Sequence, residues 1–284
     1  MAIATLIAAG RLDERLVEQI PGARLLDWIE QGSAADISMD GDPGAIKAAL
    51  SQLDGVDFAL WPGERTPARL LVADMDSTMI GQECIDELAD YAGFKDRVAA
   101  ITERAMQGEL DFAHALAERV ALLEGLDASV IQQCLAERIR PNPGASTLVR
   151  TMRARGAETI LVSGGFTAFV APIAAQIGFD RFEANVLGVH DDKLTGLTEG
   201  QIVDSRRKHD VLVEARDRLG LPSAATMAIG DGANDISMVE AAGLGIAFRA
   251  KPALAAVADA RLDHHGLDAL LWMQGIPRSE WVED

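Results

Sequence analysis

The sequence predicts an α/β protein: a parallel sheet with helices on both faces, a group of helices inserted after the first core strand, and an N-terminal βαββαβ unit. From residue 70 onward, short apolar segments alternate with helical patterns, which is typical of parallel strands joined by helices. Residues 84–139, between the first two of these segments, show helical patterns alone. Residues 1–65 follow a different order: strand, helix, strand, strand, helix, strand.

The N-terminal unit is expected to have four strands and two helices. The strands are the apolar segments 3–9, 23–29, 34–39 and 56–62, and the helices are 12–20 and 43–53. This order is that of ferredoxin-like folds. Residues 62–67, PGERTP, contain two prolines and a glycine and are typical of a linker. We therefore interpret residues 1–65 as a separate module; the alternative is that they extend the main domain.

The main domain is predicted to contain a core and a cap. Its strands are expected at 70–74, 159–163, 226–231 and 244–248. Residues 185–203 alternate like a hairpin, with the turn at Asp191 and Asp192. We expect the core to comprise residues 66–80 and 144–284, with the cap at 81–143.

The cap is expected to be helical. Its helices are predicted at 84–93, 96–108, 111–125 and 127–139. Glycine just beyond a helix is a common C-terminal stop, and the first three segments end in Gly93, Gly108 and Gly125. Asp111 and Asp127 are expected N-caps.

Composition excludes some classes of partner. The formal net charge of −18 at pH 7 argues against nucleic acid and membranes, because anionic partners are bound through clustered lysine and arginine. No run of about 18 apolar residues exists. Residues 2–10, AIATLIAAG, resemble a signal-peptide core, but no basic segment precedes them, so we interpret them as a strand. Cys84 and Cys134 are expected to be small core residues in a reducing cytoplasm.

Polar residues follow three predicted core strands at the same end. Asp74 follows the first strand, Ser163 closes the second and Asp231 closes the third. The carboxyl ends of parallel strands lie at one edge of a sheet, where ligands bind in open α/β folds. A buried strand offers no water to carboxylates, so Asp74 and the nearby Asp76 must lie at the rim with a partner. We expect one site there.

These residue types together indicate metal-assisted phosphoryl transfer. Carboxylates from Asp74, Asp231 and, as a third candidate, Asp235 suit Mg²⁺, which shares its shell with phosphate and water. A carboxylate can attack phosphorus to form an aspartyl-phosphate. Asp76 is placed to act as general acid and base. Hydrogen-bond donors for the transferred group are expected from Ser163, the Gly164 amide and Lys208.

Each motif also has a purely structural interpretation. Paired aspartates near a loop often cap helices, and SGG at 163–165 is compatible with a plain turn. Lys208 stands in the basic segment SRRKHD, so a solvated turn is an alternative for it. Residues 230–238, GDGANDISM, do not fit a calcium loop, because position six is Ile236 and position twelve is Ala242.

In their order along the chain, these motifs resemble those of the haloacid-dehalogenase superfamily. DMDST resembles the first motif (DxDx[TV]), SGG the second, Lys208 the third-motif lysine and GDGAND the fourth, from about residue 70 to about residue 270. More narrowly, DSTMIGQECIDELA, AMQGELDFAHALAERV and LVSGGF are similar to segments of the phosphoserine phosphatases. The resemblance implies a Rossmann-like core of the haloacid-dehalogenase type. It also implies hydrolysis of O-phosphoserine, the last step of serine biosynthesis.

The resemblance also implies roles for individual residues. In that family the first aspartate of the motif is the nucleophile and the second is the acid and base, which assigns these roles to Asp74 and Asp76. A Mg²⁺ ion would be held by Asp74, the backbone carbonyl of Asp76 and Asp231. Asp235 would support this arrangement, and Asn234 would contact the phosphate.

A substrate pocket is implied as well. Phosphoserine carries an ammonium and a carboxylate: Glu83 can bind the ammonium, and Arg119 can bind the carboxylate through its bidentate guanidinium. Phe112, seven residues before Arg119, is expected on the same helix face. Without the motifs, a solvated helix face would be the preferred interpretation of Glu83 and Arg119. The remaining implied contacts are Met106, Ser163, Gly164 and Gly165.

Two other functions remain open on the sequence. The first is a phosphatase of the same chemistry that acts on another small phosphate monoester, such as phosphohomoserine or a sugar phosphate. The second is a non-catalytic amino-acid-binding regulator with a vestigial hydrolase fold, although every catalytic position is filled. Some relatives carry an N-terminal module of the ACT type with the same βαββαβ order. Residues 1–65 show no clear ligand motif, and pairing of subunits into a homodimer is the role that remains for them.

Overall fold

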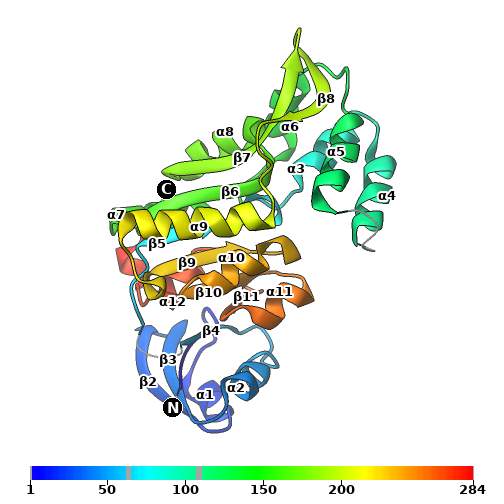
Figure 1. Cartoon of the computed structure of the whole chain (residues 1–284). Coiled ribbons are helices and arrows are strands. Elements are labelled where there is room, and N and C mark those ends of the chain that lie inside the picture. The colour runs from blue at the N-terminus through cyan, green and yellow to red at the C-terminus, as the bar shows by residue number, and fades with distance from the viewer. Residues whose placement is uncertain (1, 62–64, 107–110, 284) are drawn as a thin grey trace.

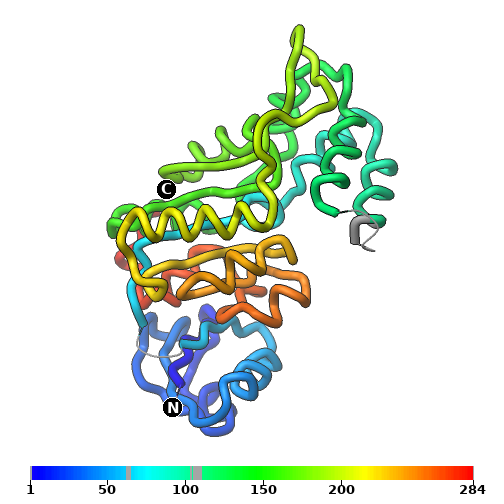
Figure 2. Tube along the Cα trace, in the orientation of Figure 1, coloured from blue at the N-terminus to red at the C-terminus, as the bar shows by residue number. Residues whose placement is uncertain are grey.

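The protein is built on one sheet with helices on both faces. The computed structural model describes residues 2–61, 65–106 and 111–283, without the side chains of residues 103, 105 and 106. The strands in these ranges form a single eleven-stranded sheet. Figure 1 shows the N-terminal strands at one end of the molecule and the cap helices at the other, and Figure 2 traces the chain between them.

Six neighbouring strands are parallel and form the core. Across the sheet they are β11 (Ala260–Leu262), β10 (Leu244–Phe248), β9 (Thr226–Gly230), β5 (Leu70–Ala73), β6 (Glu158–Phe166) and β7 (Arg181–His190). The predicted parallel sheet is therefore confirmed. The sequence pattern misses β11, which has only three residues, and the start of β7, where Arg181 and Phe182 are exposed.

Helices cover both faces of the core strands. One face carries α7 (Ala145–Ala154), α8 (Thr167–Ile177) and α12 (Ala269–Met273). The other carries α9 (Ser205–Leu219), α10 (Ile236–Ala241) and α11 (Pro252–Val257). In β5, Leu71 packs with the first group and Leu70 and Val72 pack with the second. Successive side chains of a strand point to opposite faces, so β5 is buried on both.

The cap follows β5. Its helices are α3 (Cys84–Tyr91), α4 (Lys95–Met106), α5 (Phe112–Ala121) and α6 (Ser129–Arg138), as predicted. The Asp111 carboxylate caps α5 by accepting a hydrogen bond from the His114 amide at 2.9 Å. The prediction that Asp127 is an N-cap is wrong: the helix begins one residue later, Ala128 is the N-cap, and Asp127 accepts from the Ser129 amide. Among the predicted helix stops, left-handed backbone is found at Gly93 and Gly125, and Gly108 lies outside the described residues.

A hairpin ties the cap to the core. β7 turns through Asp191 and Asp192, which have left-handed backbone (φ 51° and 59°), into β8 (Lys193–Glu199), so the predicted turn is confirmed. The Gly125 amide donates a hydrogen bond to the Leu194 carbonyl at 2.9 Å, and the Leu194 amide donates to the Leu126 carbonyl at 2.8 Å. The segment between α5 and α6 is thereby fixed to the sheet.

The N-terminal unit has the predicted element order. It consists of β1 (Ala2–Ile7), α1 (Glu14–Glu18), β2 (Ala23–Glu30), β3 (Ala34–Met39), α2 (Pro43–Leu50) and β4 (Asp57–Trp61). Its strands lie in the order β2-β3-β1-β4 and continue the core sheet, because β4 pairs antiparallel with β11. Residues 62–64 of the predicted linker lie outside the described residues, whereas Arg65 donates hydrogen bonds to Thr5 and Asp36. The division of the chain into domains stays a prediction.

The structure also shows the state of the two cysteines and the length and polarity of the helices. Cys84 and Cys134 are both free and fully buried, as expected of small core residues. Within the ranges that the structure describes, every helix is too short or too polar to cross a membrane.

Candidate active site

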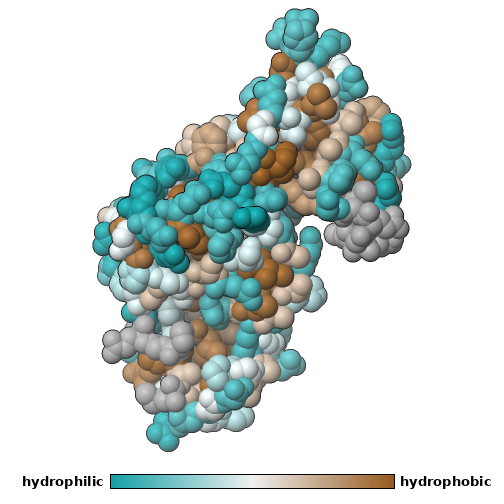
Figure 3. Space-filling model, viewed as in Figure 1, coloured by the Kyte–Doolittle hydropathy of each residue, from teal (hydrophilic) through white to brown (hydrophobic). Residues whose placement is uncertain are grey.

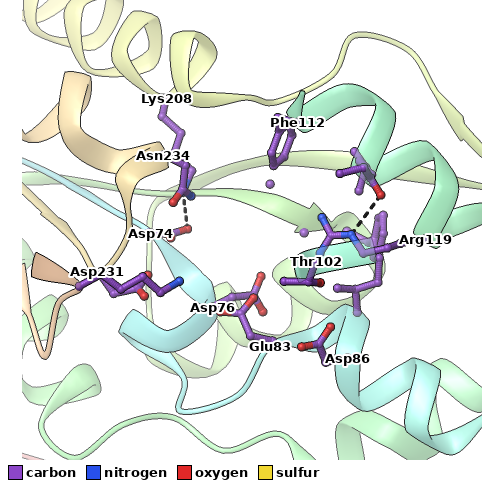
Figure 4. Close-up of a pocket in the computed structure, with 17 residues that line it drawn as sticks. Asp74, Asp76, Glu83, Asp86, Thr102, Phe112, Arg119, Lys208, Asp231 and Asn234 are labelled. Atoms are coloured by element: carbon purple, nitrogen blue, oxygen red, sulfur yellow. Dashed lines mark hydrogen bonds and ion pairs between the residues drawn. The ribbon is translucent and has the colours of Figure 1, made fainter. Parts of the chain in front are cut away.

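The predicted site lies at the carboxyl ends of β6, β5 and β9, which are parallel neighbours. Asp74 follows β5, Ser163 lies in β6 and Asp231 follows β9, so the predicted convergence of these residues is confirmed. Beside them, between core and cap, lies a cavity of about 460 Å³. Figure 3 shows the surface hollowed between these two parts, and Figure 4 shows side chains from both lining the cavity.

Lys208, on α9, is the central cation of the core end of the cavity. Its side chain is 1% exposed, and its Nζ atom lies 2.8 Å from Asp74 Oδ1 and 2.7 Å from Asp235 Oδ1. Burial lowers the pKa of a lysine, but Asp235 and Asp74 outweigh it and raise the pKa of Lys208 above its ordinary value. The alternative of a solvated basic turn is therefore wrong for Lys208.

The carboxylate of Asp235 is used entirely by the protein. Oδ1 contacts Lys208, while Oδ2 accepts hydrogen bonds from the amides of Asp231 and Gly232, each at 3.2 Å. A Cβ atom at Gly230 would lie 2.4 Å from Asp235 Cγ, so this close approach requires glycine. Asp235 thus holds both the lysine and the loop after β9 in place.

The DMDST segment forms a tight loop after β5. Asp74 lines the cavity, and its Oδ1 accepts a hydrogen bond from the Met75 amide at 2.7 Å besides contacting Lys208, so these contacts do not use Oδ2. Ser77 has left-handed backbone (φ 54°), which turns the chain back toward the start of α3. Burial and the neighbouring Asp235 raise the pKa of Asp74 well above its ordinary value.

Asp76 is held from two sides. Its Oδ1 accepts a hydrogen bond from the Cys84 amide at 2.9 Å, and its Oδ2 accepts one from the Ser163 hydroxyl at 3.2 Å. A Cβ atom at Gly165 would lie 2.7 Å from Asp76 Oδ2, so glycine leaves room for the carboxylate. Burial raises the pKa of Asp76, against the effect of the Cys84 bonds. A carboxyl group that retains a proton more readily than usual suits a general acid.

Carboxylates at the core end could hold a metal ion. Among the described residues, oxygens of Asp74, Asp231 and Asp235 lie within 4.8 Å of one another. Because both oxygens of Asp235 are already engaged, Asp74 and Asp231 are the better ligands. Burial and Asp235 raise the pKa of Asp231, which a bound cation would counteract. Hard oxygen donors of this kind fit a divalent cation such as Mg²⁺.

The cap end of the cavity carries charges of both signs. Glu83, the residue before α3, is partly open to solvent but lines the cavity, and it accepts a hydrogen bond from the Ser77 hydroxyl at 2.6 Å. Desolvation by the surrounding protein and the charge of Asp76 raise the pKa of Glu83 to about 7. Arg119 donates from Nε to the Ala115 carbonyl at 3.2 Å, and burial lowers its pKa against the effect of Asp86 and Glu83.

Other predicted pocket residues are also placed. Phe112 and Arg119 both face the cavity from α5, as their spacing predicts. The Phe112 ring rests on the core, since a Cβ atom at Gly164 would lie 3.0 Å from Phe112 Cζ. Asn234, after β9, lines the cavity as well. The side chain of Met106 lies outside the described residues.

Three polar residues that line the cavity were not predicted from the sequence. They are Asp86, Thr102 and Lys251. Lys251 follows the carboxyl end of β10, so the rule that located Asp74 and Asp231 could have found it. Asp86 lies three residues after Glu83, a spacing that places both on one side of a helix start. Thr102 carries no local signal.

The fold and the site together define an enzyme with a parallel α/β core, whose acidic, lysine-paired centre lies under a helical cap. The chain belongs to the family of haloacid dehalogenase-like hydrolases, whose family model matches residues 71–240. This agrees with the resemblance of the motifs.

Relatives of known name are similar over most of the chain. A phosphoserine phosphatase (SerB2) of Mycobacterium tuberculosis is 49% identical over 75% of this chain and 52% of its own length. One from Idiomarina loihiensis is 45% identical over 75% of this chain and 96% of its own length. The chain thus spans about half the length of the first of these relatives and nearly all of the second.

Solved structures extend the similarity to the N-terminal strands. A haloacid-dehalogenase family hydrolase from Salmonella enterica serovar Typhi has a TM-score of 0.85 and 29% identity, covering 96% of this chain and 98% of that one. A probable phosphoserine phosphatase from Vibrio cholerae has a TM-score of 0.80 and 31% identity, covering 98% and 88%. A substrate-bound phosphoserine phosphatase has a TM-score of 0.68 and 38% identity, covering 73% and 99%.

Proposed function

We propose that this protein is a phosphoserine phosphatase that hydrolyses O-phosphoserine to serine and phosphate, the last step of serine biosynthesis. The observation that carries the proposal is that one cavity has candidate catalytic groups at one end and charged groups of both signs at the other. Asp74 and Lys208 lie at its core end, and Glu83 and Arg119, of opposite charge, lie at its cap end. The names of the similar proteins support the same substrate.

The chemistry proceeds in two displacements. The free oxygen of Asp74 attacks phosphorus, and the bond to the seryl oxygen breaks while Asp76 gives that oxygen its proton. Asp76, now a carboxylate, takes a proton from water, which attacks the aspartyl-phosphate and releases phosphate from Asp74. Lys208, fixed beside Asp74 Oδ1, stabilises the negative charge on the transferred group without having to reorient.

Mg²⁺ is the proposed cofactor. Asp74 and Asp231 would hold it together with the backbone carbonyl of Asp76, and Asp235 would support them by fixing Lys208 and the loop after β9. When bound, the ion supplies positive charge that offsets the carboxylates and draws the phosphate to the site.

The substrate is oriented by residues on both sides of the cavity. Ser163, Gly164, Gly165 and Asn234 are the proposed contacts of the phosphate end, and Phe112 and Met106 are the proposed apolar contacts. Arg119 binds the carboxylate as a planar fork of donors, and Glu83 binds the ammonium. Phosphohomoserine, one methylene longer, and sugar phosphates, which lack both charged groups, fit this arrangement less well.

A panel of phosphate monoesters tests the proposal. We expect kcat/KM for O-phosphoserine to exceed that for phosphohomoserine, a hexose phosphate and an aryl phosphate. A higher value for any of the other three would replace the proposed substrate. Binding of serine without hydrolysis of any ester would favour the non-catalytic regulator.

We also propose the organisation of the chain: an N-terminal module (1–65), a hydrolase core (66–80 and 144–284) and a cap (81–143). The free, buried cysteines support a cytoplasmic setting. The proposed role of the module is to pair two subunits. Sedimentation analysis tests it, since a monomer at micromolar concentration would contradict pairing.

A further inference from the structure

Two polar atoms at the cap end of the cavity have no hydrogen-bond partner. They are Oδ1 of Asp86 and Oγ1 of Thr102, and each is buried although its residue lines the cavity. An unpaired buried polar atom is costly, and most such atoms in native proteins are paired with protein, water or ligand. Two of them beside one cavity indicate a ligand group that is able to pair with both.

The two atoms belong to different cap helices and lie near charges already described. Asp86 is in the first turn of α3, and Thr102 is in α4. Figure 4 shows both side chains together with Glu83 and Arg119 at the cap end of the cavity. The charge of Asp86 acts on Arg119 more strongly than that of Glu83, yet no ion pair within 4.0 Å joins Asp86 and Arg119 in the described part of the chain. An oxygen of Asp86 is therefore left for another partner.

An ammonium group matches these unpaired oxygens. It carries three donors and no acceptor, whereas a carboxylate and a hydroxyl oxygen both accept hydrogen bonds. Glu83 alone is not expected to accept all three hydrogen bonds of an ammonium group, because its Oε1 already accepts one from the Ser77 hydroxyl. Glu83 and Asp86 together also place two carboxylates against the single guanidinium of Arg119, which leaves the cap end with an excess of negative charge suited to a cation.

We propose that Asp86 and Thr102 determine specificity by accepting hydrogen bonds from the substrate's ammonium group, alongside Glu83. This inference rests on the proposed function and deepens it, since it assigns the ammonium to three acceptors. A substrate without an ammonium leaves both oxygens unpaired. Sites built to pair a polar group reject analogues that lack it far more strongly than apolar pockets reject a missing methylene.

Three substrates separate the possible roles of Asp86. O-phosphoserine has both charged groups, 3-phosphoglycerate has a hydroxyl in place of the ammonium, and O-phosphoethanolamine lacks the carboxylate. For Asp86→Asn we expect kcat/KM to fall roughly ten- to a hundredfold on phosphoserine and phosphoethanolamine. The loss on 3-phosphoglycerate is expected to be much smaller, so the ratio of phosphoserine to 3-phosphoglycerate falls at least about tenfold.

Thr102 is tested in the same way. Thr102→Val keeps the shape of the side chain but removes the acceptor, and is expected to lower the same ratio. Thr102→Ser, which restores a hydroxyl, is expected to recover it. Asp96→Asn is the matched control, because Asp96 is an exposed carboxylate on α4 outside the cavity, and the ratio is expected to stay at its wild-type value. Thermal unfolding of each variant confirms that it is folded.

Other patterns would overturn the inference. Equal losses on phosphoserine and 3-phosphoglycerate, with phosphoethanolamine spared, would mean that Asp86 acts only by holding Arg119. If the wild-type protein prefers phosphoserine to 3-phosphoglycerate and this preference is unchanged in Asp86→Asn and Thr102→Val, the inference is wrong and the proposed function stands. A wild type that hydrolyses 3-phosphoglycerate as well as phosphoserine would contradict the inference and the proposed function together.

Discussion

The two ends of the cavity differ in how their polar groups are paired. At the core end, Lys208 is almost fully buried between Asp74 and Asp235, and Asp235 is saturated by hydrogen bonds. At the cap end, Arg119 has a single hydrogen bond within the described residues, and oxygens of Asp86 and Thr102 have none.

This difference indicates which end of the cavity is positioned by the protein alone and which end is completed by a bound ligand. The core end is arranged by the protein itself, so its donors and charges are in place before a ligand arrives, as electrostatic catalysis requires. The cap end leaves groups for the ligand to pair. Changes at the core end are therefore expected to stop the reaction on every substrate, whereas changes at the cap end are expected to alter the choice of substrate.

Removing the nucleophile is expected to have the largest effect. In Asp74→Asn an amide replaces the attacking carboxylate and also weakens metal binding, so hydrolysis of all phosphate monoesters is expected to vanish. The fold should survive, because Lys208 keeps Asp235 as a partner. Steady-state release of phosphate measures the loss, and retention of more than a few per cent of activity would exclude Asp74 as the nucleophile.

Removal of the metal is expected to stop the reaction equally on all substrates. A chelator would leave Asp74 and Asp231 facing a phosphate dianion without the cation that offsets them. Activity is expected to return with Mg²⁺. Full activity in chelator, or recovery with Zn²⁺ alone, would contradict the assignment of a hard oxygen-ligand site.

Loss of the acid and base at the core end is expected to be severe but incomplete. In Asp76→Asn the seryl oxygen leaves without a proton and water lacks its base, so kcat is expected to fall roughly 10²- to 10⁴-fold. The loss in kcat/KM, which reports formation of the phosphoenzyme, should be smaller on an aryl phosphate, because its phenolate leaves without a proton; the loss of the base for water affects both substrates alike. Wild-type kcat in this variant would move the role of acid and base to another residue.

At the cap end, Arg119→Ala is expected to affect mainly substrates that carry a carboxylate. Loss of a charged hydrogen-bonding partner is worth about 1.5–3 kcal/mol, or ten- to a hundredfold in kcat/KM on phosphoserine. An aryl phosphate has no carboxylate and should be affected far less. Kinetics on both substrates decide the matter: equal losses would show that Arg119 merely supports the cap, and no loss on either would return it to a solvated helix face.

The smallest expected effect concerns stability. The pKa of Glu83, raised to about 7 from 4.5 by desolvation and by Asp76, means that the native state holds the proton more tightly than the unfolded chain. This stabilisation is complete below pH 4.5 and is lost as pH rises through 7. Glu83→Gln, which mimics the protonated form, is therefore expected to raise the thermal unfolding midpoint at pH 8 in the presence of chelator. At pH 4 the two proteins should unfold alike, and a wild type that is more stable at pH 8 would reverse the sign.

The sequence predicts the core end better than the cap end, for a physical reason. Strand ends in a parallel sheet must meet at one edge, so Asp74, Ser163 and Asp231 could be brought together from apolar segments alone. The burial of Lys208 could not, because its neighbours in sequence are basic and only the fold places it between two carboxylates. The environment of Thr102 likewise depends on how α4 packs beside the other cap helices.

Secondary structure shows the same limit. The apolar run of β5 and the helical period of α5 made these elements predictable, whereas β11 owes its existence to pairing with β10 and β4 rather than to its three residues. The roles of the individual site residues stay predictions until they are tested.

Trapping the phosphorylated enzyme tests the central claim, that Asp74 at the core end receives the phosphoryl group. Wild type and Asp76→Asn would be mixed with phosphoserine and Mg²⁺, quenched in acid within a single turnover and digested for mass spectrometry. Phosphate on Asp74 is the predicted result, with more of it in Asp76→Asn, where water lacks its base. Phosphate on another residue, or none in either protein, would contradict the two-step mechanism.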